Sequence, residues 1–314
     1  MNVTSGSGPS RDSGAVGGFL NINKGPGLTS TDVVRRVKRL TGQRKVGHGG
    51  TLDPDATGVL PVCLGIATRF VEAIIDGGKS YSVTVRLGAA TDTYDASGQV
   101  TRESDASHIT RADVEAVLGR FRGRIEQVPP MYSALKLGGR PLYEIARAGG
   151  TVERAPRRVD VHRLELVQWS PPDFQVEVDC GRGFYARSLA NDIGEELQNA
   201  AHMLTLERRR AGPFRIEDAI TLDALERMVK LGNWEQALYA PDFVLEDLPK
   251  VVLDPVGEEM ICHGQAVPAT GRTVVAATAG ALARMYSTEG RFLALARYDV
   301  AGPWWRPEKV VAPA

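Results

Sequence analysis

Two glycine-rich segments carry the side chains best suited to chemistry. They read GHGGTLDPDATG at residues 47–58 and GRGFYAR at residues 181–187. Glycines let a ligand backbone approach closely, and a carboxylate beside it can stabilise positive charge, attack carbon or remove a proton. Asp53 and Asp55 are equally placed by spacing alone. An ordinary Asp-Pro-Asp turn, or an aspartate capping a helix, explains the first segment as well, and a surface helix start explains the second.

Metal and cofactor chemistry finds little support in the rest of the sequence. The five histidines and three cysteines are scattered, without a C-x-x-C or H-E-x-x-H pattern. The glycine needed for a phosphate-binding P-loop before Gly78-Lys79-Ser80 is replaced by Ala73. We therefore expect a reaction that needs no metal and no cofactor.

Charge is balanced overall and polarised locally. The 314 residues include 38 basic and 38 acidic ones, so bulk electrostatics do not predict a protein that coats nucleic acid. Residues 24–45 nevertheless hold seven basic side chains and one acidic one, and residues 136–163 hold seven and three. Solvated helix faces would account for both runs. Alternatively, the two basic runs could bind a polyanion on one face of the molecule.

The segments around the two glycine-rich stretches alternate between strand and helix patterns. A strand is predicted at 18–23, followed by a helix capped at Thr29 whose outer face carries four basic side chains: Arg35, Arg36, Lys38 and Arg39. Residues 46–58 are predicted to be one long loop. Residues 79–87 alternate as a half-buried strand, with Tyr81 on the same face as its valines.

The second half of the chain continues this irregular mixture. Residues 159–169 and 174–180 alternate like a hairpin, and helices are predicted at 111–121, 140–148 and 185–198. Strands and helices without a β-α-β rhythm favour an α+β fold with a mixed, largely antiparallel sheet. We expect this domain at 18–249, after a disordered Ser/Gly-rich tail at 1–17, and a small β-rich domain at 250–314.

No apolar run reaches the roughly 20 residues that a membrane-spanning helix needs, and the first residues lack the apolar block of a secretory signal. The expectation is a cytoplasmic protein with no membrane partner.

Taken together, five blocks of this sequence resemble the TruB family of tRNA pseudouridine synthases, which isomerise a uridine in the T loop of tRNA. The blocks are residues 24–39, 47–65, 79–98, 129–149 (beginning PPMYSALKLGG) and 180–206. The resemblance implies an α+β pseudouridine synthase domain followed by a small PUA-like RNA-binding domain. One departure is visible, because the family usually has Lys-Pro where this chain has Lys24-Gly25.

Residue by residue, the resemblance assigns the catalytic aspartate to Asp53 and its neighbouring histidine to His48. Asp55 is then not the catalytic group. The tyrosine that stacks on the target base matches Tyr81, and the arginine that pairs with the aspartate matches Arg187. The implied partner is the T arm of tRNA, with the uridine extruded into the site. Basic side chains would contact the RNA backbone: Lys24, Arg35, Arg36, Lys38 and Arg39.

Two other functions stay open at this stage. A non-catalytic RNA-binding or tRNA-folding chaperone would keep the basic surfaces without needing Asp53. A guide-RNA-dependent synthase of the archaeal and eukaryotic branch would share the catalytic loop and depend on protein partners. The lack of long basic tails favours a stand-alone enzyme, which we expect to be a monomer with no obligatory protein partner.

Overall fold

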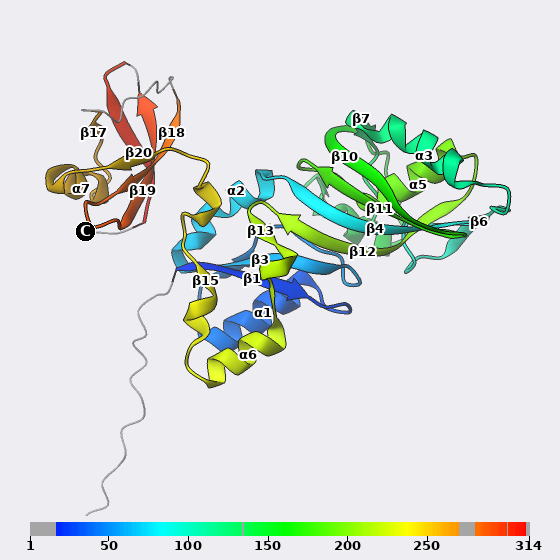
Figure 1. The fold of residues 1–314 in the computed structure, drawn as a ribbon, viewed down its shortest axis with the longest axis horizontal. Helices are drawn as coiled ribbons and strands as arrows, with labels where there is room; N and C mark the ends of the chain where they lie inside the picture. The colour runs from blue at the N-terminus through cyan, green and yellow to red at the C-terminus, as the bar shows by residue number, and fades with distance from the viewer. Residues whose placement is uncertain (1–16, 134, 270–279, 300, 312–314) are drawn as a thin grey trace, which may run out of the picture.

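The computed structural model of the chain describes residues 17–133, 135–269, 280–299 and 301–311. The tail expected at 1–17 therefore lies, apart from Gly17, outside the described residues. A mixed sheet forms the centre of the molecule, and a second sheet forms a smaller domain at the C-terminal end (Figure 1). The α+β class expected from the irregular order of strands and helices is confirmed.

The central sheet is mostly antiparallel. Only the β1·β14 and β3·β12 pairs are parallel within it. In spatial order its main strands are β14 (Ile220–Thr221), β1 (Gly18–Lys24), β3 (Thr57–Leu64), β12 (Ala201–Ala211), β4 (Lys79–Leu87), β11 (Asp173–Cys180), β10 (Arg157–Ser170) and β7 (Gly123–Gln127). Three short strands extend it: β2 (Val46–His48) on β3, β13 (Phe214–Arg215) on β12, and β15 (Leu238–Tyr239) on β1.

Two groups of helices cover parts of this sheet. The helix α1 (Ser30–Thr41) packs with α6 (Leu222–Lys230) beneath β1 and β3 (Figure 1). The helices α3 (Arg111–Leu118) and α5 (Ala186–Glu196) pack on the face of β4, β11 and β10 that carries the buried valines. Thr29 caps α1 as expected, because its hydroxyl accepts a hydrogen bond from the Asp32 backbone amide.

Smaller elements connect these layers. A 3-10 turn (Gly65–Phe70) and α2 (Val71–Asp76) follow β3. The hairpin β5 (Ala89–Thr91)–β6 (Val100–Glu103) lies beyond β4. Between β7 and β10 lie β8 (Lys136–Leu137), β9 (Arg140–Pro141) and α4 (Leu142–Arg147).

Three expected boundaries change. Residues 46–58 are not one loop, because 46–48 pair with β3 and only 49–56 lie between the two strands. The helix expected at 140–148 begins at Leu142, since Arg140 and Pro141 pair as a strand. The regular part of α3 ends at Leu118, where a 3-10 turn takes over.

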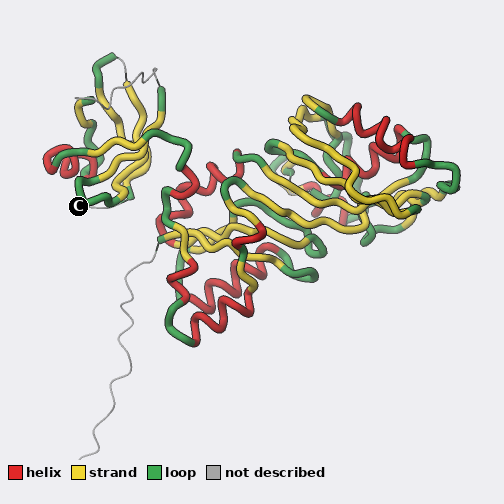
Figure 2. Tube along the Cα trace, viewed as in Figure 1, coloured by secondary structure: helices red, strands yellow, loops and turns green. Residues whose placement is uncertain are grey.

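Within its described residues, the C-terminal domain contains five strands and one helix. Figure 2 draws its strands in yellow and its helix in red. The strand order is β16 (Lys250–Val252), β18 (Leu282–Tyr286), β19 (Phe292–Asp299), β20 (Trp304–Val310) and β17 (Val267–Pro268), and the helix is α7 (Pro255–Cys262). Its β-rich character agrees with the composition of this part of the chain.

Candidate active site

The loop 49–56 is held by buried side chains that bond its carbonyl oxygens. Arg208 donates to the carbonyls of Gly50 (3.0 Å) and Thr51 (3.3 Å), and Ser30 donates to Leu52 (3.1 Å). The Lys24 ammonium donates to Pro54 at 2.8 Å. Four of the five backbone carbonyls from Gly50 to Pro54 therefore have a side-chain donor. These contacts hold the loop backbone in place, with the Asp53 carboxylate partly exposed to solvent.

Arg187, in the first turn of α5, forms an ion pair with Asp53. Its Nε lies 3.0 Å from Asp53 Oδ2, and a terminal nitrogen donates to Oδ1 at 3.3 Å. The arginine side chain is only 8% exposed, whereas that of Asp53 is 39% exposed. The buried guanidinium of Arg187 thus holds the carboxylate on its protein side, and the other side of the carboxylate is exposed to solvent. Asp55 is exposed and Arg187 pairs with Asp53 instead, so the geometry separates the two aspartates that spacing alone left equal.

A second carboxylate shares Arg187. Asp95 Oδ2 lies 3.6 Å from the Arg187 Nε, and Arg187 also donates to the backbone carbonyl of Tyr132 at 2.8 Å. Asp95 is not among the site residues predicted from the sequence. The residue does lie in the 79–98 block of the family resemblance, which is the signal that could have found it.

Opposing effects act on the ionisation of Asp53. Burial is the largest, and it raises the pKa of the carboxyl above its ordinary value. The Arg187 guanidinium lowers this pKa, while the negative charge of Asp95 raises it. The net shift is upward, so Arg187 offsets part of the burial cost of keeping Asp53 charged.

Tyr81 lies on β4 with its ring in the core layer that contains Val83 and Val85, as the alternation predicted. The ring stacks near Phe184, with centroids 6.2 Å apart and planes inclined by 28°. Burial raises the pKa of its phenol, the charge of Arg208 lowers it, and the charge of Asp53 adds to the rise. Tyr81 is therefore a candidate member of the site that contains the Asp53–Arg187 pair.

His48 ends β2, directly before the loop, and is half-buried. Burial and the nearby charge of Arg208 lower the pKa of its imidazole, which keeps the ring neutral at pH 7. Its position agrees with a role at the edge of the site, and its role stays a prediction.

The expected backbone-binding residues divide into three groups. Lys24 is fully buried, with its ammonium bonded to the carbonyls of Gly25, Leu28 and Pro54, so the expectation that it contacts RNA phosphates is wrong. Arg36 forms ion pairs with two α6 side chains, Asp223 (2.7 Å) and Glu226 (3.0 Å). The remaining three are exposed on α1: Arg35, Lys38 and Arg39.

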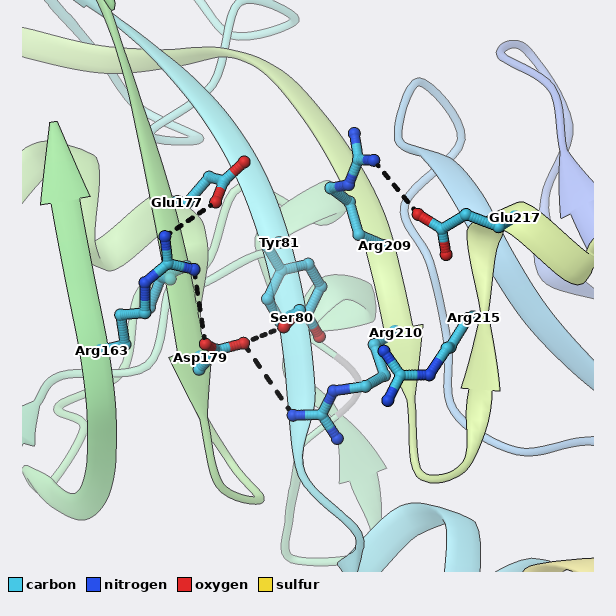
Figure 3. Close-up of a pocket in the computed structure, with 10 residues that line it drawn as sticks. Ser80, Tyr81, Arg163, Glu177, Asp179, Arg209, Arg210, Arg215 and Glu217 are labelled. Carbon is cyan, nitrogen blue, oxygen red and sulfur yellow. Dashed lines mark hydrogen bonds and ion pairs between the residues drawn. The ribbon is translucent and has the colours of Figure 1, made fainter. Parts of the chain in front are cut away.

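A cavity of about 320 Å³ lies on the sheet face that carries Ser80 and Asp179, and Figure 3 shows the arginines around it. These arginines are largely neutralised by acidic neighbours. Arg163 pairs with Glu177 at 3.2 Å and with Asp179 at 3.8 Å, and Arg209 pairs with Glu217 at 3.4 Å. Tyr81 lines this cavity, whereas Asp53 and Arg187 do not. The Asp53–Arg187 pair therefore lies outside this cavity.

Within the described ranges, no group of three His, Cys, Asp or Glu side chains is placed to hold a metal ion. No helix in those same ranges is long and apolar enough to cross a membrane.

Two solved structures share this architecture. A crystal structure of a Cbf5-Nop10-Gar1 complex matches with a TM-score of 0.72 and 30% identity, covering 94% of this chain and 85% of that one. An H/ACA RNP bound to a substrate RNA containing 2′-deoxyuridine matches with a TM-score of 0.71 and 27% identity, again over 94% and 85%. This fold, together with the match of residues 38–186 to a pseudouridylate synthase family model, defines the class as pseudouridine synthase.

Sequence comparison specifies the family. Residues 38–186 match the model of the TruB family pseudouridylate synthase N-terminal domain, and residues 187–254 match that of the tRNA pseudouridylate synthase B C-terminal domain. A tRNA pseudouridine synthase B of Symbiobacterium thermophilum is 48% identical over 80% of this chain and 83% of its own length. One from Geotalea uraniireducens is 43% identical over 91% and 93%. The chain belongs to the TruB family, and it is an isomerase.

Proposed function

We propose that this chain converts a uridine in the T loop of tRNA into pseudouridine, with Asp53 as the catalytic carboxylate. The observation that carries the proposal is the partly exposed Asp53 carboxylate, paired at 3.0 Å with the buried Arg187. The names of the relatives, which are tRNA pseudouridine synthases, support tRNA as the substrate.

The reaction breaks the N1–C1′ bond of uridine, turns the base, and joins C5 to C1′ while the C5 proton leaves and N1 gains one. Atoms and electrons balance without a donor or a redox partner. Cleavage places positive charge on the sugar, and the Asp53 carboxylate can stabilise that charge, attack C1′ or remove the C2′ proton. Arg187 keeps the carboxylate charged in a site from which water must be excluded.

Tyr81 holds the uracil while it is detached. Stacking of a base on an aromatic ring contributes about 1–3 kcal/mol, which offsets part of the few kcal/mol needed to extrude the uridine. Exposed basic residues on α1 supply phosphate contacts that do not depend on sequence: Arg35, Lys38 and Arg39. The β-rich domain at 250–314 serves as a PUA-like RNA-binding module in this proposal.

The experiment that tests the proposal incubates the purified full chain alone with an unmodified tRNA transcript. A stand-alone synthase forms pseudouridine under these conditions. A guide-dependent enzyme forms none without its partners, and a chaperone binds the tRNA without changing it. Mass spectrometry of the T-loop fragment after chemical labelling of pseudouridine identifies the modified position.

Asp53→Asn is the decisive variant. Asn has nearly the same shape and lacks the charge, so we expect tRNA binding to remain and pseudouridine formation to fall by several orders of magnitude. Asp55→Asn is the matched control, since Asp55 is exposed two residues away, and it should retain most of the activity. Near-normal turnover by Asp53→Asn rules out the mechanism.

A further inference from the structure

Arg208 is among the largest fully buried side chains, with 1% of its surface exposed. It lies on β12 directly opposite Tyr81 of β4, and next to β3 through the backbone pairing of Arg208 with Gly58. The contact with β3 is so close that a β-carbon on Gly58 would lie 2.3 Å from the Arg208 carbonyl oxygen. Arg208 thus stands where the catalytic loop rejoins the sheet.

The guanidinium bridges both ends of the Asp53 loop. Its Nε donates to the carbonyl of Val59 at 2.7 Å, on the strand that leaves the loop. Its two terminal nitrogens donate to the carbonyls of Thr51 and Gly50, on the segment that enters the loop. A planar fork with donors on three nitrogens can span these acceptors, whereas a single ammonium nitrogen cannot.

No carboxylate among the described residues forms an ion pair with this buried cation, although arginine keeps its charge in proteins. The charge therefore acts on its uncharged neighbours. Of these, Tyr81 lies directly opposite Arg208 in the register of β4 and β12, and the Arg208 charge lowers the pKa of its phenol. A buried charge without an acidic partner is costly. Arg208 nevertheless lies against two parts of the site, the Asp53 loop and Tyr81.

We propose that Arg208 is a positioning residue that fixes the Asp53 loop and orients the Tyr81 phenol toward the same reaction. This inference rests on the proposed function. Because Arg208 is buried, it does not touch RNA, and it acts through the carbonyls of residues 50, 51 and 59 and through Tyr81. Its removal should affect catalysis per bound RNA and not RNA binding.

The first test compares Arg208→Lys with Arg209→Lys. Arg209 is the next residue on the strand, 44% exposed, and paired on the surface with Glu207 and Glu217. We expect Arg208→Lys to lower kcat about 10²-fold with an unchanged KM, because a displacement of about 1 Å in a catalytic group costs that much. Arg209→Lys should stay within about twofold. If kcat per folded molecule is unchanged in Arg208→Lys and only the melting temperature falls, the role is merely structural and the proposal is wrong.

A second variant removes the fork and the charge together. Arg208→Met has a similar length, and it leaves the carbonyls of Gly50, Thr51 and Val59 without this donor, so kcat is measured per folded molecule. It is expected to lower kcat at least as much as Arg208→Lys, since both the fork and the charge are lost. Wild-type kcat in a folded Arg208→Met enzyme overturns the proposal.

A third measurement does not depend on activity. Amide hydrogen exchange of residues 49–58 should be at least about tenfold faster in Arg208→Met than in the wild-type chain, and unchanged in Arg209→Lys. Unchanged exchange in Arg208→Met would refute the link to the loop even if the chain proved to have another substrate. Conversely, if Asp53→Asn retains activity while exchange responds to Arg208, the proposed function fails and the positioning of the loop stands.

A double-mutant cycle tests the connection to Tyr81. In a Tyr81→Phe background the hydroxyl is already absent, so Arg208→Met should lower single-turnover rates by a smaller factor than in the wild-type background. Equal factors in both backgrounds contradict the part of the proposal that concerns Tyr81.

Discussion

Asp53 is balanced between a cation that favours its charge and a neighbouring carboxylate that opposes it. Arg187 contacts both Asp53 and Asp95, at 3.0 and 3.6 Å. Because burial already raises the pKa of Asp53, each neighbour shifts the pH at which the proposed catalytic carboxylate is ionised. The two substitutions that remove these neighbours should therefore act in opposite directions.

Arg187→Gln removes the charge that lowers the pKa of Asp53, so that pKa rises further. The rate needs the ionised carboxylate and falls as pH drops through this pKa, so the acid limb of the pH–rate profile moves to higher pH. Asp95→Asn removes a negative charge, which lowers the pKa of Asp53 and moves the acid limb to lower pH. Single-turnover rates from pH 4 to 8 measure both, and shifts of the same sign contradict this account.

At the scale of the strand, Tyr81 combines a core position with an active-site position. Tyr81→Leu should abolish most activity, because neither stacking nor the hydroxyl remains. Tyr81→Phe keeps the ring, and we expect a loss of about 10²–10⁴-fold if the hydroxyl assists removal of the C5 proton. The position of Tyr81 directly opposite the buried Arg208 favours this role. With uridine tritiated at C5, Tyr81→Phe should release label more slowly than it breaks the glycosidic bond. If Tyr81→Phe retains nearly full activity, the hydroxyl has no role in proton removal and the residue acts only by stacking on the base.

The helix α1 offers a matched comparison among its basic side chains. Lys38 and Arg39 are exposed, whereas Arg36 is committed to Asp223 and Glu226 of α6. Replacing Lys38 and Arg39 with Ala should weaken tRNA binding and reduce the slope of log K against log salt by up to roughly two. Arg36→Ala should leave the slope unchanged and cost at most about 1 kcal/mol of stability. Equal effects on the slope would show that α1 does not contact phosphates selectively.

Sequence patterns predicted the elements whose cause is local. The Thr29 cap, the alternation around Tyr81 and the hairpin of β10 with β11 depend on neighbouring residues, and the structure has all three. The pairing of β2 with β3 and the parallel contact of β3 with β12 depend on distant segments and were not predicted.

The candidate site divides in the same way. The family resemblance brought out Asp53, Tyr81 and Arg187. The structure pairs Asp53 with Arg187, and the charge of Asp53 acts on the Tyr81 phenol. Lys24 was misassigned. In the sequence it looks like any other lysine of a basic run, whereas in the structure it is buried and its ammonium donates to three backbone carbonyls. Arg208 was missed for the same reason, since it lies in a run of three arginines of which it alone is fully buried.

At the scale of the whole molecule, the C-terminal sheet shares a hydrophobic core with the catalytic domain. Phe292 of β19 packs on Phe70 with ring centroids 5.8 Å apart, and Tyr286 belongs to the same cluster. Polar contacts reinforce this core, since Lys309 donates to the Arg69 carbonyl and Arg69 donates to that of Val310. Phe70 follows β3, the strand that leaves the Asp53 loop, so the two domains meet on the segment that supports the site.

This shared core predicts that the two domains unfold together, in a single calorimetric transition. Phe292 is 9% exposed, and Phe292→Ala should cost about 3–5 kcal/mol because it opens a cavity between the C-terminal sheet and Phe70. The loss falls on the C-terminal side of the junction, so the variant should show a separate transition for that domain below the main one. Differential scanning calorimetry of the full chain measures both transitions.

The control for this variant is Val256→Ala, on α7 of the same domain, where the side chain is 66% exposed. It removes apolar atoms without disturbing the junction, so the single transition should remain and stability should change by no more than about 0.5 kcal/mol. If Phe292→Ala instead keeps one transition at the wild-type midpoint, the Phe70–Phe292 contact does not couple the domains. A split transition in Val256→Ala as well would mean that any weakening of the C-terminal domain separates it, and the junction would have no special role.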